Sequence, residues 1–437
     1  MGDARLYTFA FVVGVAWLVV KLMRIGRRDR ALPPGPPTIP LLGNLHVLPR
    51  KFVFLKFSEW KKEYGGIYSL KLANATAIVL SDMRIVKELL DDRSSETSSR
   101  PYFYALEVLA KGFFFVLATS DNPVWRASRK SIQPFFSVQA TDAHVRIMER
   151  ESSVLLHDVL HNPNDLTSHI IRYTFSSITD LAFGKRVLKP DSPEILNFRS
   201  YIRTFAKAVS PEAAPVDLIP ILRYVPDFLA PWMKLWCETQ TQQRSLYFSF
   251  LDHAERTTGG GKEKSIIQTT LEQRRELGLT REMVAYTGGA LLDAGTETIA
   301  TTTRSLLLCL MSRPACLKKA QEEIDDLIGD KRLPLASDID ALPYIQALIK
   351  ERLCPGIHFA GTSLNVAVMR LIWAFDFSLG DDFSGADRPW MLEDDYEDDM
   401  KGIALAPKEY FCKVTPRSAE RAKVIEDCYN LYNNSDV

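Results

Sequence analysis

The sequence shows no excess of either charge, because 54 lysine and arginine residues are matched by 54 aspartate and glutamate residues. This balance argues against a surface that is basic throughout, so nucleic acid is not an expected partner. Cysteine is scarce, with six residues in 437, and no two of them form a C-x-x-C pair. A zinc ribbon, a thioredoxin-like site and a disulfide framework are therefore disfavoured, and we expect reduced thiols that face the cytosol.

Apolar residues make up 46% of the chain and charged residues 25%, which is the ordinary balance of a globular protein. Wholesale disorder requires fewer apolar residues and more net charge, so it is excluded. The length fits one large helical domain or two to three smaller ones, and no internal repeat is visible.

One hydrophobic run near the amino end is long enough to span a membrane. Residues 6–20 carry no charge, and Leu22 and Met23 extend the run past Lys21, which can snorkel. The run thus reaches about 17 residues, the minimum for a transmembrane helix. Four arginines follow it between residues 24 and 30, and this positive flank favours an anchor whose carboxyl side is cytoplasmic. The alternative is a cleaved signal peptide, whose basic start and small-residue exit are not clearly present.

Prolines are dense in the segment after this run, which reads PPGPP at residues 33–37. Such a segment cannot be a helix or a central strand, and it predicts a stiff extended spacer. We therefore divide the chain into a membrane anchor with its basic flank at residues 1–30, a proline-rich hinge at 31–45 and a body at 46–437.

The body is predicted to be mainly α-helical, with a small β portion close to the hinge. β-Branched residues at 67–72 and 76–80 flank a short turn and predict a hairpin. Ser81 is predicted to cap the helix that follows, in which Ile85 and Leu89 lie four residues apart.

A helix of about thirty residues is predicted in the second half of the chain. Thr280 is its expected cap, its side chains stay mostly apolar or small until Ser312, and Pro314 prevents its continuation. Pro314 is expected to start another helix, which Gly329 ends. The apolar face of that helix comprises Leu317, Ala320, Ile324 and Leu327.

The long helix contains the segment AGTET at residues 294–298. Gly295 costs about 1 kcal/mol relative to alanine in a helix interior, and a flat or bulky group pressed against the backbone would explain that cost. Glu297 and Thr298 place an acid and a hydroxyl by the same groove, and such a pair can relay protons to a bound ligand. The alternative is a close helix–helix crossing with an exposed Glu297, and on these five residues alone it is favoured.

Two further places carry candidate chemistry. Cys354 precedes Pro355 and Gly356, where a turn leads into a new helix, so its thiolate would suit a soft metal or a haem iron. Taken alone, a single cysteine is more often a buried apolar residue. Trp125 and Arg129 share one helical face that could hold an anion, although a packed tryptophan beside a solvated arginine is favoured in isolation.

Taken in order, these segments resemble those of a microsomal cytochrome P450. The motif sequences are similar to those of fungal members, many of which serve secondary metabolism. The resemblance covers nearly the whole chain, and a chance match of six ordered motifs would be rare. The motifs are the anchor, the PPGPP hinge, WRASR (125–129), AGTET (294–298), LPYIQALIKE (342–351) and RLCPGIHFAG (352–361).

The resemblance implies a role for each matching residue. Cys354 matches the proximal thiolate ligand of the iron of haem b, and Gly356 matches the glycine that lets the next helix pack closely. Arg352 matches an arginine that pairs with a haem propionate. The remaining cofactor contacts that it implies are Trp125 and Arg129 at the propionates, and Ala294 and Gly295 on the long helix.

The resemblance also implies an activity. Glu297 and Thr298 match an acid–alcohol pair above the distal face of the haem, where oxygen is activated. The expected enzyme is a monooxygenase that takes electrons from an NADPH-cytochrome P450 reductase, uses O₂ and hydroxylates an apolar small molecule. Its expected location is the endoplasmic reticulum membrane, as a single-pass protein with its body in the cytosol.

The sequence departs from the family pattern after Glu351. Only Arg352 and Leu353 separate this glutamate from Cys354, whereas the family normally has several dozen residues there. That segment would carry the arginine of the Glu-x-x-Arg motif and strands of the substrate pocket, so the β region is expected to be incomplete. Glu351 loses its partner, and an unpaired buried carboxylate is destabilising by roughly several kcal/mol.

The departure leaves two other functions open. One is a truncated, catalytically impaired P450-like membrane protein that binds haem weakly or not at all. The other is a helical membrane adaptor whose motifs are relics. Under each of the three, we expect the surviving helical body to be recognisable.

Overall fold

The structure is a computed structural model. It describes residues 2–49, 52–113, 122–210, 215–217, 219–257, 264–349, 357–379, 396–397, 406–408, 410 and 412–434. The chain divides into two compact units. The first comprises Met1–Ala105 and Val209–Trp232, and the second comprises Leu106–Ala208 and Met233–Val437.

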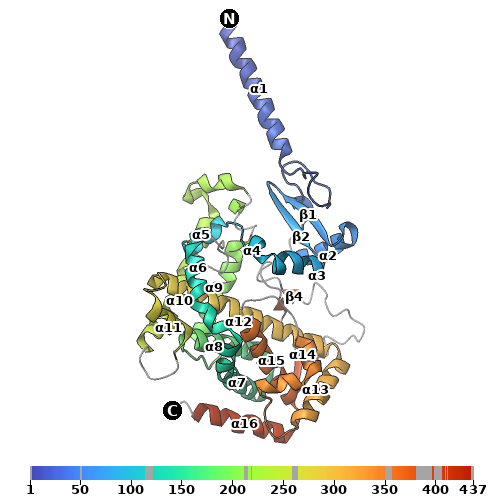
Figure 1. The fold of residues 1–437 in the computed structure, drawn as a ribbon, viewed down its shortest axis with the longest axis vertical. Helices are drawn as coiled ribbons and strands as arrows, with labels where there is room; N and C mark the ends of the chain where they lie inside the picture. The colour runs from blue at the N-terminus through green and yellow to red at the C-terminus, as the bar shows by residue number, and fades with distance from the viewer. Residues whose placement is uncertain are drawn as a thin grey trace. The chain divides into compact units, whose positions relative to one another are not determined.

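The first unit begins with α1 (Gly2–Arg24), which Figure 1 shows as one long helix. Its stretch Tyr7–Arg24 has a mean hydropathy of 1.6 and is not buried by any other part of the described chain. Length and composition thus allow α1 to cross a membrane, as the sequence predicts.

A β-hairpin and one helix form the core of the first unit. The hairpin consists of β1 (Ile67–Leu72) and β2 (Ala75–Leu80), which pair antiparallel, and this confirms the predicted hairpin. Trp60 of α2 (Val53–Tyr64) packs with Tyr68 and Leu70 of β1 in a buried cluster. The other short elements of this unit are η1 (Leu45–Val47), α4 (Ser94–Thr97), η6 (Pro215–Asp217), η7 (Pro220–Tyr224) and η8 (Asp227–Leu229).

The proline-rich hinge is fastened to β1. Prolines have no N–H, so a proline-rich segment contains few backbone donors and its carbonyl groups need donors from outside the segment. Ser69 donates from its backbone N–H to Pro34 at 2.8 Å and from its hydroxyl to Pro33 at 2.6 Å. Arg28 donates to the carbonyl oxygens of Gly35 at 2.6 Å and Pro36 at 2.7 Å. These bonds fix the spacer against the hairpin edge.

The helix after the hairpin is capped by Asp82, so the prediction of Ser81 as its cap is wrong. The backbone N–H of Ser81 donates to the Gly66 carbonyl at 2.8 Å, which extends the pairing of β1 and β2 by one residue at the open end of the hairpin. The Asp82 carboxylate accepts from the Arg84 N–H at 2.8 Å, at the start of α3 (Met83–Val86). The chain then continues as a π-helical segment, η2 (Lys87–Asp92).

The second unit is mainly helical (Figure 1). Its helices are α5 (Tyr104–Ala110, which begins in the first unit), α6 (Pro123–Ile132), α7 (Val138–His161), α8 (Leu166–Phe183), α9 (Pro193–Val209), α10 (Pro231–Thr257), α11 (Ile266–Gln273), α12 (Arg281–Met311), α13 (Pro314–Ile328), α14 (Pro343–Ile349), α15 (Ile357–Ala374) and α16 (Ala419–Asn434). Short 3-10 segments lie at η4 (Gln133–Phe136), η5 (Pro163–Asp165) and η9 (Ala336–Ala341).

The long helix α12 confirms the predicted bounds. Thr280 caps it by accepting from the Met283 N–H at 3.2 Å, and Ser312 follows its last residue. Figure 1 shows α12 running through the helical unit, and it packs along α8. The next helix, α13, starts at Pro314 and is followed by Gly329 as predicted.

One residue of the predicted apolar face of α13 is placed differently. Leu317, Ala320 and Ile324 are buried, whereas Leu327 of the same predicted face is 44% exposed. Gln321 is buried as well, and its amide donates to Asp376 at 3.0 Å. The covered side of α13 therefore includes a polar side chain that has a partner on a neighbouring strand.

Strands are few among the described residues of the second unit. β3 (Phe375–Leu379) pairs antiparallel with β6 (Cys412–Pro416), and β4 (Tyr396–Glu397) pairs with β5 (Ala406–Pro407). A mainly α-helical body with a small β portion is thus confirmed.

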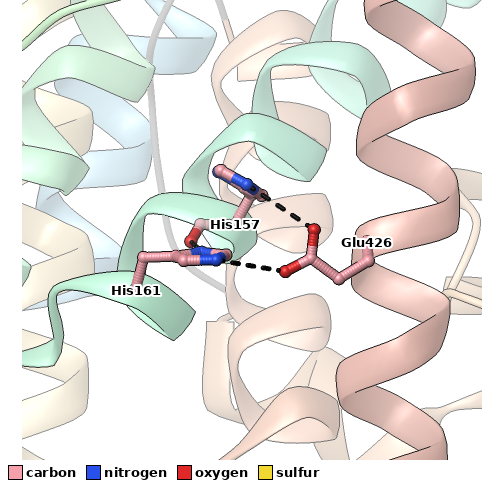
Figure 2. A group of neighbouring side chains, drawn as sticks. All are labelled: His157, His161 and Glu426. Atoms are coloured by element: carbon pink, nitrogen blue, oxygen red, sulfur yellow. Dashed lines mark hydrogen bonds and ion pairs between the residues drawn. The ribbon is translucent and has the colours of Figure 1, made fainter.

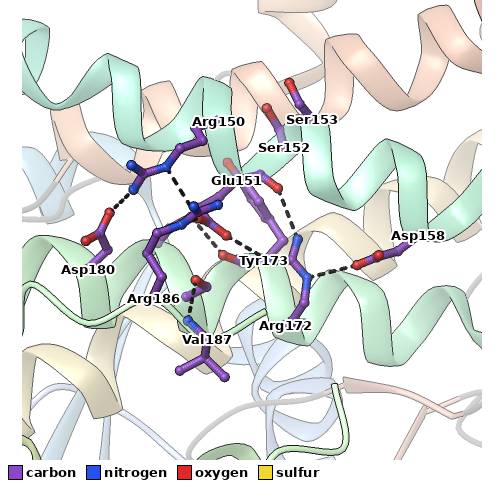
Figure 3. Close-up of polar contacts among 12 residues, drawn as sticks. Arg150, Glu151, Ser152, Ser153, Asp158, Arg172, Tyr173, Asp180, Arg186 and Val187 are labelled. Atoms are coloured by element: carbon purple, nitrogen blue, oxygen red, sulfur yellow. Dashed lines mark hydrogen bonds and ion pairs between the residues drawn. The ribbon is translucent and has the colours of Figure 1, made fainter. Parts of the chain in front are cut away.

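A buried ion network joins α7 to α8 (Figure 3). Glu151 of α7 accepts from Arg172 of α8 at 2.8 Å and from Arg186 at 2.7 Å, and Arg172 also lies 3.0 Å from Asp158. Arg150 pairs with Asp180 on the same face. The network fixes the two helices on which α12 and α15 pack.

Helix α15 is attached to this frame by buried polar contacts. Arg370 donates to the hydroxyl groups of Ser152 at 2.9 Å and Ser153 at 3.0 Å, both on α7. The Tyr173 hydroxyl of α8 donates to the Ser363 carbonyl at 2.8 Å. These bonds position the helix that follows the cysteine motif in the sequence.

Candidate active site

The central turns of α12 have one open face. Ala294 and Thr298 are exposed, whereas Thr296, Ile299 and Ala300 beside them are buried. The Thr298 hydroxyl donates to the Ala294 carbonyl at 2.7 Å, one turn earlier. Because residues four apart lie on the same side of a helix, a small side chain and a hydroxyl face the same open space.

Gly295 lies where α12 crosses α8. A Cβ at this glycine would meet Ile178 Cδ1 at 2.5 Å, so any other residue would require the Ile178 side chain to shift. This is the helix crossing that the sequence left as an alternative. A contact of Gly295 or Ala294 with a cofactor stays a prediction.

Glu297 is half-buried on α12, not exposed as the crossing alternative required. Burial raises the pKa of its carboxyl group, and the positive charges of Arg199, Arg304 and Arg203 only partly offset this. A carboxyl group with a raised pKa is suited to hold and release a proton near neutral pH.

Asp293 is a residue that sequence reasoning missed. One of its carboxylate oxygens accepts from the Tyr201 hydroxyl at 2.8 Å and from the Tyr247 hydroxyl at 2.5 Å, and Gln243 donates to Tyr201 at 2.8 Å. Its other carboxylate oxygen is buried without a hydrogen-bond partner. Burial raises the pKa of Asp293 to about 7, although both tyrosines oppose the rise, and the nearby charge of Glu297 adds to it.

The signal for Asp293 was present in the sequence. It lies four residues before Glu297, within an apolar run, so both carboxyl groups had to share one side of the helix. Its tyrosine partners are on α9 and α10, however, and no local pattern pairs them with it.

The residues Trp125 and Arg129 both lie on α6, half-buried and one turn apart. Asn122 caps this helix by accepting from the Val124 N–H at 2.8 Å. The Thr287 hydroxyl of α12 donates to the Ser128 hydroxyl at 3.0 Å, so α6 packs directly on α12. The structure thus brings WRASR and AGTET onto two contacting helices.

Three predicted haem residues, Cys354, Arg352 and Gly356, lie outside the described residues, as does Glu351. The helix after them, α15, begins at Ile357. Its Phe359 ring lies 6.4 Å from the ring of Phe136, just after α6. The described parts of the chain therefore bring both α6 and α15 against α12.

A family model described as cytochrome P450 matches residues 33–353, which is well over half of the chain. The chain belongs to the cytochrome P450 family. It is therefore an enzyme of the P450 monooxygenase type, and the family implies a haem on a cysteine thiolate, a redox partner and O₂. The matched region of this P450 ends one residue before Cys354.

Curated relatives of this P450 are fungal enzymes. The cytochrome P450 monooxygenase virE of Hypocrea virens is 31% identical, and the alignment covers 95% of this chain and 91% of the relative. A cytochrome P450 monooxygenase of Armillaria gallica is 35% identical over 79% of this chain and 66% of the relative.

A solved structure of a zebra fish cytochrome P450 with progesterone has the same fold. Its TM-score is 0.66 at 19% identity, and the match covers 83% of this chain and 99% of that chain. This likeness concerns the fold alone, and it confirms the P450-like helical architecture expected from the sequence.

The alignment with the Hypocrea virens relative runs over 511 positions, whereas this chain has 437 residues, so at least 74 positions lack a residue from this chain. A lost internal segment would produce such an excess. Its place after residue 351 stays a prediction from the motifs.

The described residues fit a haem in two respects. The open face at Ala294 and Thr298 offers small side chains against which a flat macrocycle can lie. Three of the five described cysteines are poor competitors for the iron, because burial raises the pKa of Cys412 to about 11 and also raises those of Cys309 and Cys428. A thiol with a raised pKa gives little thiolate, so these residues do not replace Cys354.

A cavity of about 280 Å³ lies against α16, with Arg370 and Cys428 among its lining residues. None of the predicted haem contacts lines it.

Proposed function

We propose that this P450 is a haem-thiolate monooxygenase of fungal secondary metabolism that hydroxylates an apolar small molecule. The observation that carries the proposal is the open face of α12, where Thr298 is exposed and Glu297 has a raised carboxyl pKa, within a chain of the P450 family. When bound, the haem supplies oxygen activation, which protein side chains cannot perform.

The residues of the chain supply binding, orientation and protons. Cys354 is the proposed thiolate ligand, Gly356 lets α15 pack close to it, and Arg352, Trp125 and Arg129 are the proposed propionate contacts. Arginine suits this role because its fork of N–H groups matches a carboxylate.

Proton supply is assigned to α12. Burial raises the carboxyl pKa of the half-buried Glu297, which favours its protonated form, and the Thr298 hydroxyl lies on the adjacent position of the same helix. Ala294 and Gly295 keep this part of α12 free of bulky side chains. The mostly apolar surface of α12 limits entry of water.

The proposed setting is the endoplasmic reticulum membrane, with α1 as the single span and the body in the cytosol. The arginines after α1 support this orientation. An NADPH-cytochrome P450 reductase is the proposed electron donor, and the basic pair Arg129 and Lys130 at the end of α6 is its proposed docking surface. The proposed domain plan remains anchor at 1–30, hinge at 31–45 and P450 domain at 46–437.

The test is spectroscopic. The full chain is expressed with haem precursor, reduced and exposed to carbon monoxide, and the red-shifted Soret band of a thiolate-ligated haem is expected. Cys354→Ala should abolish the band. Cys237→Ala is the matched control, because Cys237 is an exposed free cysteine on α10, and it should leave the band intact.

A second candidate function is a catalytically impaired P450-like membrane protein with weak or no haem binding. Two findings favour it. The family match stops at residue 353, and the alignment with the Hypocrea virens relative contains positions for which this chain has no residue. Inserting the corresponding segment of the Hypocrea virens relative after Glu351 separates the two. A thiolate-type band that appears only in the restored chain supports impairment, and a band in the chain as it stands supports the monooxygenase.

A further inference from the structure

Two histidines and a glutamate from distant parts of the chain meet on the surface of the second unit (Figure 2). His157 and His161 lie one turn apart on α7, and Glu426 faces them from α16. His161 Nε2 lies 3.3 Å from one Glu426 oxygen, and His157 Nε2 lies 3.7 Å from the other. One donor atom from each of the three side chains lies within 4.8 Å of the other two.

The hydrogen bond of His161 decides which of its ring nitrogens can present a lone pair to the Glu426 carboxylate. His161 Nδ1 lies 2.9 Å from the His157 carbonyl oxygen. A carbonyl oxygen only accepts, so Nδ1 carries the proton and a neutral ring presents the Nε2 lone pair to Glu426. In a neutral ring two acceptors thus face each other at 3.3 Å, and a cation at Nε2, either a proton or a metal ion, makes this contact favourable.

His157 is held in place without hydrogen bonds to its ring nitrogens. Nδ1 is buried without a hydrogen-bond partner, 3.9 Å from the Asp158 carboxylate, and 3.7 Å is too long for Nε2 to bond Glu426. Its ring stacks on Tyr429 of α16, with centroids 3.6 Å apart and planes 8° apart.

We propose that His157, His161 and Glu426 bind a divalent transition-metal ion of the Zn²⁺ class, with water completing the coordination, and thereby tie α16 to α7. Two histidines four residues apart on a helix plus one carboxylate form a common zinc donor set. Ligands at about 2.0–2.1 Å in a tetrahedral site lie about 3.3 Å from one another. The two histidine–carboxylate distances of 3.3 and 3.7 Å, each to a different Glu426 oxygen, are close to this spacing, and one donor atom from each side chain lies within 4.8 Å of the others.

Two further features suit this role. His161 is exposed, so an ion reaches the site from solvent. The bond from His161 Nδ1 to a backbone carbonyl is the outer contact that usually orients a metal-binding histidine. The proposal concerns no residue of the candidate active site, and its outcome is independent of haem binding.

The test is zinc binding by the full chain in detergent, purified without a histidine tag and stripped with EDTA. Titration with ZnCl₂ in competition with a chromophoric chelator should show a site of one equivalent. His161→Ala and Glu426→Gln should each weaken that site at least about tenfold, because each removes one of three ligands. Glu420→Gln on the same helix is the matched control, since Glu420 is exposed and lies outside the cluster, and it should bind as the wild type does.

A thermal measurement makes the test independent of the free cysteines, which can also take up zinc. Zinc in excess should raise the unfolding midpoint of the wild type and of Glu420→Gln, because a ligand that binds only the folded state stabilises it. It should not raise the midpoint of Glu426→Gln. Equal zinc affinity and equal thermal shifts in Glu426→Gln and the wild type, or no binding of one equivalent by the wild type, would overturn the proposal.

Discussion

Glu151 and Asp293 are carboxylates enclosed by helices of the same unit, but their surroundings move their pKa values in opposite directions. Burial alone would raise the pKa of Glu151, yet Arg172, Arg186 and Arg150 together lower it. Asp293 has hydrogen-bonding tyrosines in place of arginines, and burial raises its pKa to about 7.

The difference separates a structural network from a site that can exchange protons. Arginine partners keep Glu151 charged, so the α7–α8 network acts as a fixed frame. On α12, burial is the largest cause of the raised pKa values of Asp293 and Glu297. Both residues lie on the turns of α12 that carry the open face at Thr298. Perturbed carboxyl groups of this second kind are typical of functional sites.

The largest expected effect is on the unfolding free energy, and it tests the ion network between α7 and α8. Glu151→Gln removes the shared anion from three arginines, and an uncompensated buried charge costs about 3–5 kcal/mol in unfolding free energy. Urea unfolding of the full chain measures it. Glu322→Gln is the control, because Glu322 belongs to an exposed pair with Lys318 at 3.9 Å, and its change should stay within about 0.5 kcal/mol. Equal losses of unfolding free energy in Glu151→Gln and Glu322→Gln would contradict the structural role of the α7–α8 network.

The second prediction concerns pH. Asp293→Asn removes a carboxyl group whose pKa is about 7 in the folded chain against an ordinary value of 3.8. A raised carboxyl pKa gives stability that is fully present below the ordinary value and is lost as the pH rises through the folded value. Between about pH 4 and 7 the wild type should therefore lose stability relative to Asp293→Asn, by at most about 4 kcal/mol.

Urea unfolding of both proteins at about pH 5 and pH 8 measures this change. Asp338→Asn is the control: Asp338 is partly buried, but Arg332 lowers its pKa below 3.8, so its contribution is lost only in acid. The difference between the wild type and Asp338→Asn should be constant over the same interval. A constant difference for Asp293→Asn as well would contradict the assignment of a protonatable group on α12.

The third prediction tests how closely α12 approaches the frame. Gly295→Ala places a Cβ 2.5 Å from Ile178 Cδ1, and overpacking of this kind costs about 1–3 kcal/mol. In the Ile178→Ala background the cost should shrink, which a double-mutant cycle detects. Gly361→Ala in α15 is the control, because nothing lies within 4 Å of its Cβ position, and it should be neutral or slightly stabilising. Additive effects at Gly295 and Ile178 would count against the crossing.

The smallest effect on stability is expected at Thr298. Its side chain is exposed and bonds only to the Ala294 carbonyl of its own helix, so Thr298→Ala should change unfolding free energy by less than about 0.5 kcal/mol. With a reductase and NADPH supplied, the same substitution should uncouple oxygen consumption from product formation. The ratio of product to NADPH consumed measures the coupling, and an unchanged ratio would exclude Thr298 from the proton relay.

Local signals in the sequence accounted for the helices and the hairpin because caps and turns act over a few residues. Thr280 satisfies the first N–H groups of α12, and Pro314 prevents its continuation, so both bounds were readable. Ser81 was misassigned because the hairpin uses its backbone N–H, which depends on pairing with Gly66. Leu327 lies on the predicted apolar face of α13 but is exposed, because the neighbouring elements decide how much of that face is covered.

By itself, the sequence determined the family, the order of the motifs, the apolar helix at the amino end and the short span between Glu351 and Cys354. Only the tertiary structure decided which side chains meet each ionisable group. Glu151 meets Arg172 and Arg186, Asp293 meets Tyr201 and Tyr247, and Glu426 meets two histidines more than 260 residues earlier. The physical reason is that pKa values and metal sites depend on distances in space, and helix packing sets those distances between residues that no local pattern connects.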